Sequence, residues 1–269
     1  MPIDKATTDQ TSRRAISPEA RRVVGLARAP RQASADNRWA RTLRALNADA
    51  AEITEVADPC GATLLYAQRF SHARISSVIK DLLSSPTALR EIARRSYAHD
   101  NGFAKVVLLE KGYKLRLHYR PATAARGAEN IHDHRWDFLS SVLFGKLVVE
   151  KFEQCAAKAT GAFTVPDCVY IARENGSSEY GIRPVGLAHL KQVSADVYAA
   201  NSAYYLNAAV LHRIVTVQGG SYATLVFTHR PFASTTRLMP GKKYALTQSV
   251  QTMSVARLTG VLQQVAEQL

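Results

Sequence analysis

Apolar residues recur at helical spacing along much of the first hundred residues. Three segments share this pattern: 38–56, 71–85 and 85–97. In the first segment, Trp39, Leu43 and Leu46 fall on one side of a helix. Ser85 followed by Pro86 is a typical helix start, because proline is tolerated in the first turn. The sequence therefore predicts that this part of the chain is helical.

From residue 102 the pattern changes to short runs with strand character, separated by glycine or asparagine turns. Two runs flank Gly112 as a hairpin, and two more flank Gly145. We expect roughly ten short strands within 102–232, since no helical period is present there. The predicted fold class is mainly β, an antiparallel β-barrel or double-sheet jelly roll. Apolar residues return to helical spacing over 250–269, which predicts a closing helix.

These patterns divide the chain into four parts: a basic flexible arm (1–37), a helical cap (38–98), a β-barrel (99–249) and a C-terminal helix (250–269). Residues 1–45 hold ten Lys/Arg and four Asp/Glu, a net +6 of the +13 carried by the whole chain. A solvated arm is the simpler interpretation, and contact with nucleic acid or an anionic surface is the alternative. No aromatic residue interleaves with these arginines before Trp39, so we expect no nucleic-acid partner.

Composition narrows the class of protein further. No run of about 18 apolar residues is present, so no membrane span is expected. The N-terminus lacks the apolar core of a secretory signal. Cys60, Cys155 and Cys168 are widely spaced and odd in number, which argues against a disulfide framework. We therefore expect a cytoplasmic protein.

Two of the eight histidines, His132 and His134, stand one residue apart before the apolar run that ends at Gly145. Because side chains alternate along a strand, both point to the same face, with Cβ atoms roughly 6.5–7 Å apart. That face continues through Phe138 to Phe144 and is expected to be the interior. Buried imidazoles need polar partners, and one metal ion would satisfy both. Two surface histidines on an edge strand are the alternative.

The stretch from Gly127 to Gly145, which contains both histidines, resembles the first motif of the cupin superfamily of metal-binding β-barrels. The resemblance implies a cupin-type jelly roll with an N-terminal helical cap. In that motif a glutamate normally follows four or five residues after the second histidine, where this chain has Phe138 and Leu139. Asp137 is one residue short of those positions. By strand parity it points to the other face, so we expect no contact with the metal.

A second stretch, 211–232, resembles the second cupin motif, which supplies one more histidine from a later strand, here His212. Three histidines without a carboxylate are the pattern of cysteine dioxygenase and its thiol-dioxygenase relatives, which both stretches resemble within 99–232. The resemblance implies that His132, His134 and His212 bind a non-haem Fe(II), with molecular oxygen as co-substrate. Zinc, copper, nickel or manganese fit the same ligands.

The chain departs from the thiol dioxygenases in the residues that serve the substrate. That family carries a Ser-His-Tyr series on the strand after the third histidine, where this chain has Thr224, Val226 and Thr228. The cysteine that is cross-linked to the tyrosine in the animal enzymes is also missing between His134 and Gly145. We therefore expect a small polar or anionic substrate other than free cysteine.

Arg116, His118 and Arg120 alternate with apolar residues and share one face of a predicted strand. If this face lines the barrel cavity, Arg116 or Arg120 can bind a carboxylate with two hydrogen bonds, and His118 can serve as an acid or base near neutral pH. A solvent-facing polar side is the alternative. Further candidates around the cavity are Arg95, His99, Glu129, Tyr204 and Tyr205, whereas His72, His189 and His229 are expected outside it.

The sequence thus predicts a mononuclear non-haem metal-dependent oxygenase acting on a small molecule. One alternative is a metal-dependent isomerase or lyase that uses the same site without oxygen. Another is a non-catalytic sensor or binding protein, for which a DNA-contacting helix-turn-helix should precede the barrel. The break at Ser84-Ser85-Pro86 is a poor match to that tight turn. A homodimer is compatible with the sequence, and the identity of the substrate is left open.

Overall fold

The structure is a computed structural model that describes residues 30–99, 101–124, 128–171, 179–216, 220–240, 247–249 and 251–269. Residues 1–29 of the expected arm therefore lie outside the described residues. Residues 30–37, which the sequence placed in the same arm, belong to the first helix. Within the described part of the chain, no helix is long and apolar enough to cross a membrane.

In the part of the chain that the structure describes, four helices precede the strands and one follows them: α1 (Pro30–Thr54), α2 (Pro59–Arg69), α3 (His72–Leu83), α4 (Pro86–Ala93) and α5 (Val255–Ala266). The sequence analysis missed α2, whose apolar spacing is weak. Its start nevertheless carries a signal, because the Asp58 carboxylate accepts a hydrogen bond from the Gly61 backbone N–H at 2.6 Å and Pro59 follows the cap.

The strands form two antiparallel sheets. One sheet has the order β1-β2-β3-β11-β5-β9, with bounds Tyr97–Ala98, Ala104–Glu110, Lys114–Arg120, Tyr222–Thr228, Phe138–Phe144 and Ala203–Leu206. The other has the order β13-β8-β6-β10-β4-β12-β7, with bounds Thr247–Ser249, Glu179–Ala199, Lys146–Gln154, Leu211–Thr216, Ile131–His132, Thr235–Met239 and Phe163–Ile171. The predicted class, a mainly β two-sheet fold with helices at both ends, is therefore confirmed.

Two strand predictions need correction. The segments 181–193 and 197–207, which the alternation predicts as separate strands, are joined differently: β8 runs without a break from Glu179 to Ala199, because its first part pairs with β7 and its second part with β6. Strands β12 and β13 lie beyond residue 232, where no strand was expected.

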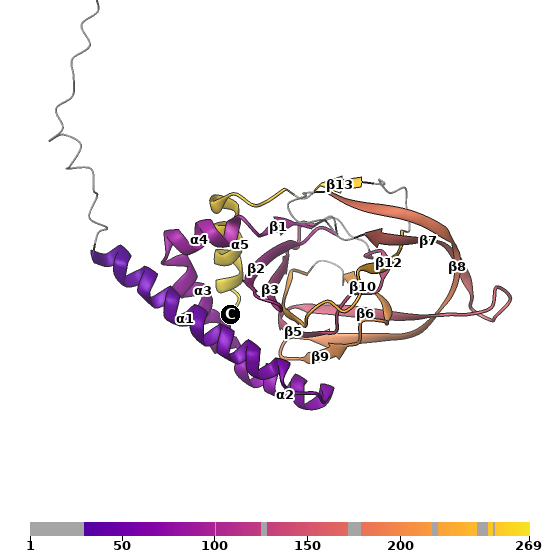
Figure 1. Ribbon diagram of the computed structural model, residues 1–269, viewed down its shortest axis with the longest axis horizontal. Coiled ribbons are helices and arrows are strands. Elements are labelled where there is room, and N and C mark those ends of the chain that lie inside the picture. Colours follow the sequence, from indigo (N-terminus) through magenta and orange to yellow (C-terminus); the bar gives the residue numbers. More distant parts are fainter. Residues whose placement is uncertain are drawn as a thin grey trace, which may run out of the picture.

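The sheet that begins with β1 separates two apolar layers. On its outer face, Leu117, Leu225 and Phe227 pack with residues of the helices, among them Tyr66 and Leu82, in one buried cluster. Alternate residues of the same strands point the other way, towards the second sheet. Figure 1 shows the helices gathered on one side of the paired sheets, with α5 lying between α3 and the strands. Among the residues described, the helices therefore cover the outer face of the sheet that begins with β1.

The chain crosses from one sheet to the other directly after the two histidines. Strand β4 ends at His132 in one sheet, and β5 begins at Phe138 in the other. The prediction of one continuous strand from His132 to Phe144 is therefore wrong. Phe144 also faces the helix side, because the pairing of β5 with β11 shifts register at Ala223.

Candidate functional site

His132, His134 and His212 converge although they come from three different backbone settings. His132 ends β4, His134 lies in the crossover between the sheets, and His212 lies on β10, paired directly with His132. The ring centroids are 4.7–5.0 Å apart. One potential ligand atom from each ring lies within 4.8 Å of the other two. Small rotations of the three rings would bring one nitrogen of each to about 2.0–2.1 Å from a single ion.

Backbone carbonyls fix the orientation of two of the rings. His132 Nδ1 lies 2.8 Å from the Asn130 carbonyl oxygen, and His212 Nδ1 lies 3.0 Å from the Val210 carbonyl oxygen. Since a carbonyl oxygen can only accept, each Nδ1 must carry the proton and donate it. The opposite nitrogen, Nε2, is then unprotonated, and its lone pair is available to bind a metal ion.

Burial keeps the rings of His134 and His212 uncharged at neutral pH. Burial lowers the pKa of His212 to about 3, with a further contribution from the charge of His132. Burial also lowers the pKa of His134 well below its usual value, and the neighbouring His132 and His212 act in the same direction. Neutral imidazole is the form that ligates a metal, so no proton has to be displaced from these rings at pH 7.

The nearby aspartates are engaged elsewhere. Asp137 accepts hydrogen bonds from the Tyr205 hydroxyl at 2.6 Å and from the Ala208 backbone N–H at 2.7 Å. Asp133 accepts one from the Arg237 backbone N–H at 2.6 Å. These contacts hold the crossover segment, residues 133–137, at both of its ends. Among the described residues, the group with ligand atoms close enough to share one ion consists of the three histidines alone.

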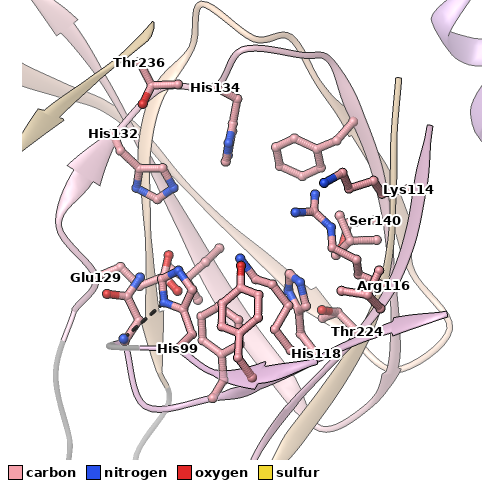
Figure 2. Close-up of a pocket in the computed structure, with 18 of the residues that line it drawn as sticks. His99, Lys114, Arg116, His118, Glu129, His132, His134, Ser140, Thr224 and Thr236 are labelled. Atoms are coloured by element: carbon pink, nitrogen blue, oxygen red, sulfur yellow. Dashed lines mark hydrogen bonds between the residues drawn. The ribbon is translucent and has the colours of Figure 1, made fainter. Parts of the chain in front are cut away.

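The three histidines line a cavity of about 700 Å³ between the sheets. Figure 2 shows His132 and His134 on one side, with Arg116, His118 and Thr224 across from them. The opposite wall follows strand register: His118 on β3 pairs with Lys105 on β2 and with Thr224 on β11. Arg116 and His118, on the polar face of β3, therefore line the cavity. Arg120, on the same face, is not among the residues that line the cavity.

Arg116 is a buried cation that stacks on an aromatic ring. Its side chain is 8% exposed, and its Cζ lies 5.4 Å from the centroid of the Trp136 ring. Trp136 in turn stacks on His134, with ring centroids 6.1 Å apart. The indole thus connects the histidine group with the guanidinium across the cavity.

Two further histidines line the cavity without joining the three-histidine group. Burial lowers the pKa of His118 well below its usual value, and the charges of Lys105 and Arg116 add to this effect. His99 also has a pKa lowered well below its usual value, mainly by burial. Its Nδ1 accepts a hydrogen bond from the Asn101 backbone N–H at 3.2 Å. Both rings are neutral at pH 7 and can exchange a proton with a bound molecule.

The remaining candidates divide between the cavity and its surroundings. Glu129 and Tyr204 line the cavity, and burial raises the pKa of Glu129. Arg95 also lines it, but its guanidinium donates to the backbone carbonyl oxygens of Val107 and Leu108. Arg95 therefore braces β2 against α4. The cavity lining does not include His72, His189 or His229, as expected from the sequence. It also does not include Tyr205, which the sequence had suggested as a cavity residue.

Sequence reasoning missed Lys105 and gave no role to Trp136. Lys105 lies on β2 between apolar residues, and its Nζ is 5.2 Å from the Tyr97 ring centroid and 5.6 Å from that of Phe103. The sequence did hold one signal, a lone lysine inside an apolar run that forms a hairpin with the Arg116 strand. Trp136 follows His134 by two residues, at the same strand parity.

Comparisons with known proteins gave no match to a family model and none to a curated protein. Solved structures that resemble part of the chain include a hydroquinone 1,2-dioxygenase in complex with Cd²⁺ and 4-hydroxybenzonitrile. The sequence identity is 18%, the matched region covers 54% of this chain and 72% of the dioxygenase chain, and the TM-score is 0.30. An oxalate oxidase in complex with glycolate is 12% identical, covers 52% and 56%, and has a TM-score of 0.29.

A cupin superfamily protein from Desulfitobacterium hafniense is 12% identical, covers 51% of this chain and 86% of its own, and has a TM-score of 0.28. The three structures are thus described as a dioxygenase, an oxidase and a cupin superfamily protein. At such identities and scores, the likeness does not assign an activity to this chain. The resemblance to cysteine dioxygenase stays a hypothesis.

Proposed function

We propose that the protein is a mononuclear non-haem metal-dependent oxygenase, with Fe(II) as its metal, acting on a small anionic molecule. The observation that carries this proposal is a three-histidine group facing a cavity between the sheets that is also lined by the buried cation Arg116. A structural metal site is normally closed by four protein ligands, whereas a catalytic site keeps positions open.

His132, His134 and His212 are the proposed metal ligands. Their donor set fits a divalent ion, because two Nδ1 protons are fixed on carbonyl oxygens and the opposite nitrogens remain as ligands. A divalent iron held there would supply the binding and activation of dioxygen. Three neutral ligands leave the charge of the ion uncompensated, which favours an anionic substrate.

Arg116 is proposed to bind an anionic group of the substrate, and His118 to accept or donate a substrate proton at Nε2. Both atoms needed for these roles, Arg116 Nε and His118 Nε2, are buried in the cavity wall without a partner in the described part of the chain. Phe138 and Val226 line the same cavity and exclude water from the bound molecule.

A metal-dependent isomerase or lyase on the same three histidines is the second candidate. It is favoured by His99 and His118, two neutral imidazoles that line the cavity, because proton transfer between carbon or oxygen atoms needs a base that can accept a proton from the bound molecule. The two candidates differ in one requirement, which is dioxygen.

The test combines metal content with oxygen uptake. We expect about one metal ion per chain, and at least tenfold less in His132→Ala, His134→Ala and His212→Ala. His189→Ala is the control, since His189 bonds to Thr164 away from the cavity. The iron-loaded protein should consume oxygen with one member of a panel of amino acids, thiols, hydroxy acids, diketones and dicarboxylates, but slowly or not at all with free cysteine.

Full metal occupancy in His212→Ala would remove the three-histidine assignment. Substrate turnover under anaerobic conditions with zinc in place of iron would replace the oxygenase by the isomerase or lyase. Rapid oxidation of free cysteine would contradict the substrate expectation drawn from Thr224 and Val226.

A further inference from the structure

Three buried side-chain nitrogens lack a hydrogen-bond partner among the residues that the structure describes: Arg116 Nε, His118 Nε2 and Trp136 Nε1. All three side chains line the same cavity. A buried donor that stays unpaired costs about 1–3 kcal/mol, so such groups are normally satisfied. Their gathering in one cavity indicates a ligand that supplies the missing partners.

The chemistry of these atoms defines that ligand. Arg116 Nε and the Trp136 indole nitrogen can only donate hydrogen bonds. The guanidinium lies beside the indole, with 5.4 Å between Arg116 Cζ and the ring centroid, so both donors belong to one region of the wall. Arg135 lies 4.9 Å from the same indole centroid, which adds a second guanidinium around the ring. Two donors next to a positive charge are complementary to an oxyanion.

Cations outnumber acids among the residues that line this cavity: Arg94, Arg95, Lys105, Lys114, Arg116 and Arg135 stand against Glu110, Glu129 and Asp133. Lys105 lies over the Tyr97 and Phe103 rings, a setting in which an ammonium group is attracted by the ring faces. Glu110, the acid on the same strand as Lys105, forms an ion pair with Lys114 at 2.5 Å. The wall around Arg116 therefore carries an excess of positive charge into the cavity, separate from the charge of an ion on the histidines.

We infer that the cavity binds a molecule with two anionic groups. One group is directed to the three-histidine site, and the other is a carboxylate held by Arg116 Nε–H and the Trp136 indole N–H beside Lys105. The first contact rests on the proposed function, whereas the second rests on the cavity wall alone. Trp136 bridges the two ends, since its ring is 6.1 Å from that of His134, and this favours a short diacid.

The experiment measures binding by calorimetry on the full-length protein loaded with Zn(II), in which no oxygen chemistry takes place. Succinate and butyrate are compared, because they have four carbons each and differ by one carboxylate. The series from malonate to adipate, each with its matched monoacid, covers the unknown spacing. We expect one diacid to bind at least tenfold more tightly than its monoacid, as one hydrogen-bonded charge contact is worth about that factor.

Two variants locate the second carboxylate. Arg116→Gln should abolish the preference for the diacid, and Trp136→Phe should reduce it severalfold, because it keeps the ring and removes only the N–H. Arg213→Gln is the matched control: Arg213 pairs with Glu150 at 2.6 Å and does not line the cavity, so the preference should be retained. In Trp39→Phe, Trp136 is the one remaining tryptophan of the chain, and its fluorescence should change on binding.

The inference is overturned if no diacid is preferred over its monoacid, or if Arg116→Gln retains the preference. These outcomes are independent of oxygen uptake. A diacid preference without oxygen uptake by the iron form would uphold the inference and remove the oxygenase. 3-Phosphonopropionate, of similar length to succinate, tests the second group: tighter binding than succinate would overturn the carboxylate in favour of a phosphate-like group, and weaker binding would support it.

Discussion

At the scale of single residues, the site depends on where the backbone places protons. The Asn130 and Val210 carbonyl oxygens each lie two residues before a histidine and bind its Nδ1. The peptide chain therefore selects the tautomer of His132 and His212 without any additional side chain. His118 differs, because its Nε2 is buried and unpaired in the described residues.

His118 should make stability depend on pH. Burial lowers its pKa in the folded protein, whereas in the unfolded chain it takes up a proton below about pH 6.5. Below that pH the unfolded state binds more protons, so the free energy of unfolding should fall, by up to about 1.4 kcal/mol per pH unit for each such histidine. Urea unfolding of the metal-free protein between pH 7 and pH 5 measures this slope.

His118→Gln should flatten that slope, because the variant removes one group that is neutral only in the folded state. His72→Gln, at the start of α3 and outside the cavity, is the control and should leave the slope as it is. A slope in His118→Gln equal to that of the unchanged protein would show that His118 is not held neutral by the fold.

At the scale of elements, the sequence predicted the hairpins and turns, because these depend on residues that are close together in the chain. The hairpin of β2 and β3 and the turn between β5 and β6 follow from alternation and from glycine at the turns. The alternation of Arg116 and His118 also predicted their common face, which register then placed in the cavity.

The sequence could not predict the features that depend on the partner of a strand. The crossover after His132 needs the position of both sheets, and the reversal of Phe144 comes from a register shift against β11. Lys105 enters the site through pairing of β2 with β3, so its role appears only once the hairpin is folded. His212 was located by resemblance to a motif, since a lone histidine after an apolar run carries no signal of its own.

Gly145 should be essential for the turn between β5 and β6. Its φ is +75°, and an added Cβ would lie 2.3 Å from the Ser221 carbonyl oxygen and 2.9 Å from Tyr222 Cα. Gly145→Ala should lower the free energy of unfolding by about 2–5 kcal/mol, the sum of left-handed strain and overpacking. Gly161→Ala, with a φ of +78° and nothing within 4 Å, should cost only about 1–2 kcal/mol. Equal losses in urea unfolding would contradict the close approach.

At the scale of the whole molecule, the helices and the sheet that begins with β1 share one apolar core. Tyr66 on α2 reaches the sheet directly, because its hydroxyl donates to the Leu225 carbonyl oxygen at 2.5 Å. The helical layer therefore supports the wall that carries Arg116 and His118, and it is not an independent unit.

Leu82→Ala should destabilise helices and sheets together. Leu82 is fully buried on α3, and truncation of such a leucine costs about 2–5 kcal/mol. We expect one transition, with coincident midpoints by far-ultraviolet circular dichroism and by tryptophan fluorescence. Leu64→Ala on α2 is the control, since Leu64 is 66% exposed and should cost about 0.5 kcal/mol or less. Two separate transitions would show that the helices unfold on their own.

The crossover segment, residues 133–137, has an evolutionary consequence. Its ends are fixed by Asp133 and Asp137, whereas His134 donates its backbone N–H to the Ala208 carbonyl oxygen and packs its ring against Trp136 and Phe138. A change of codon at position 134 can therefore alter the donor set while the crossover stays in place. A single substitution at this position would leave two of the three proposed histidine ligands in place. Replacement of Asp133 or Asp137, by contrast, would remove hydrogen bonds that hold one end of the crossover.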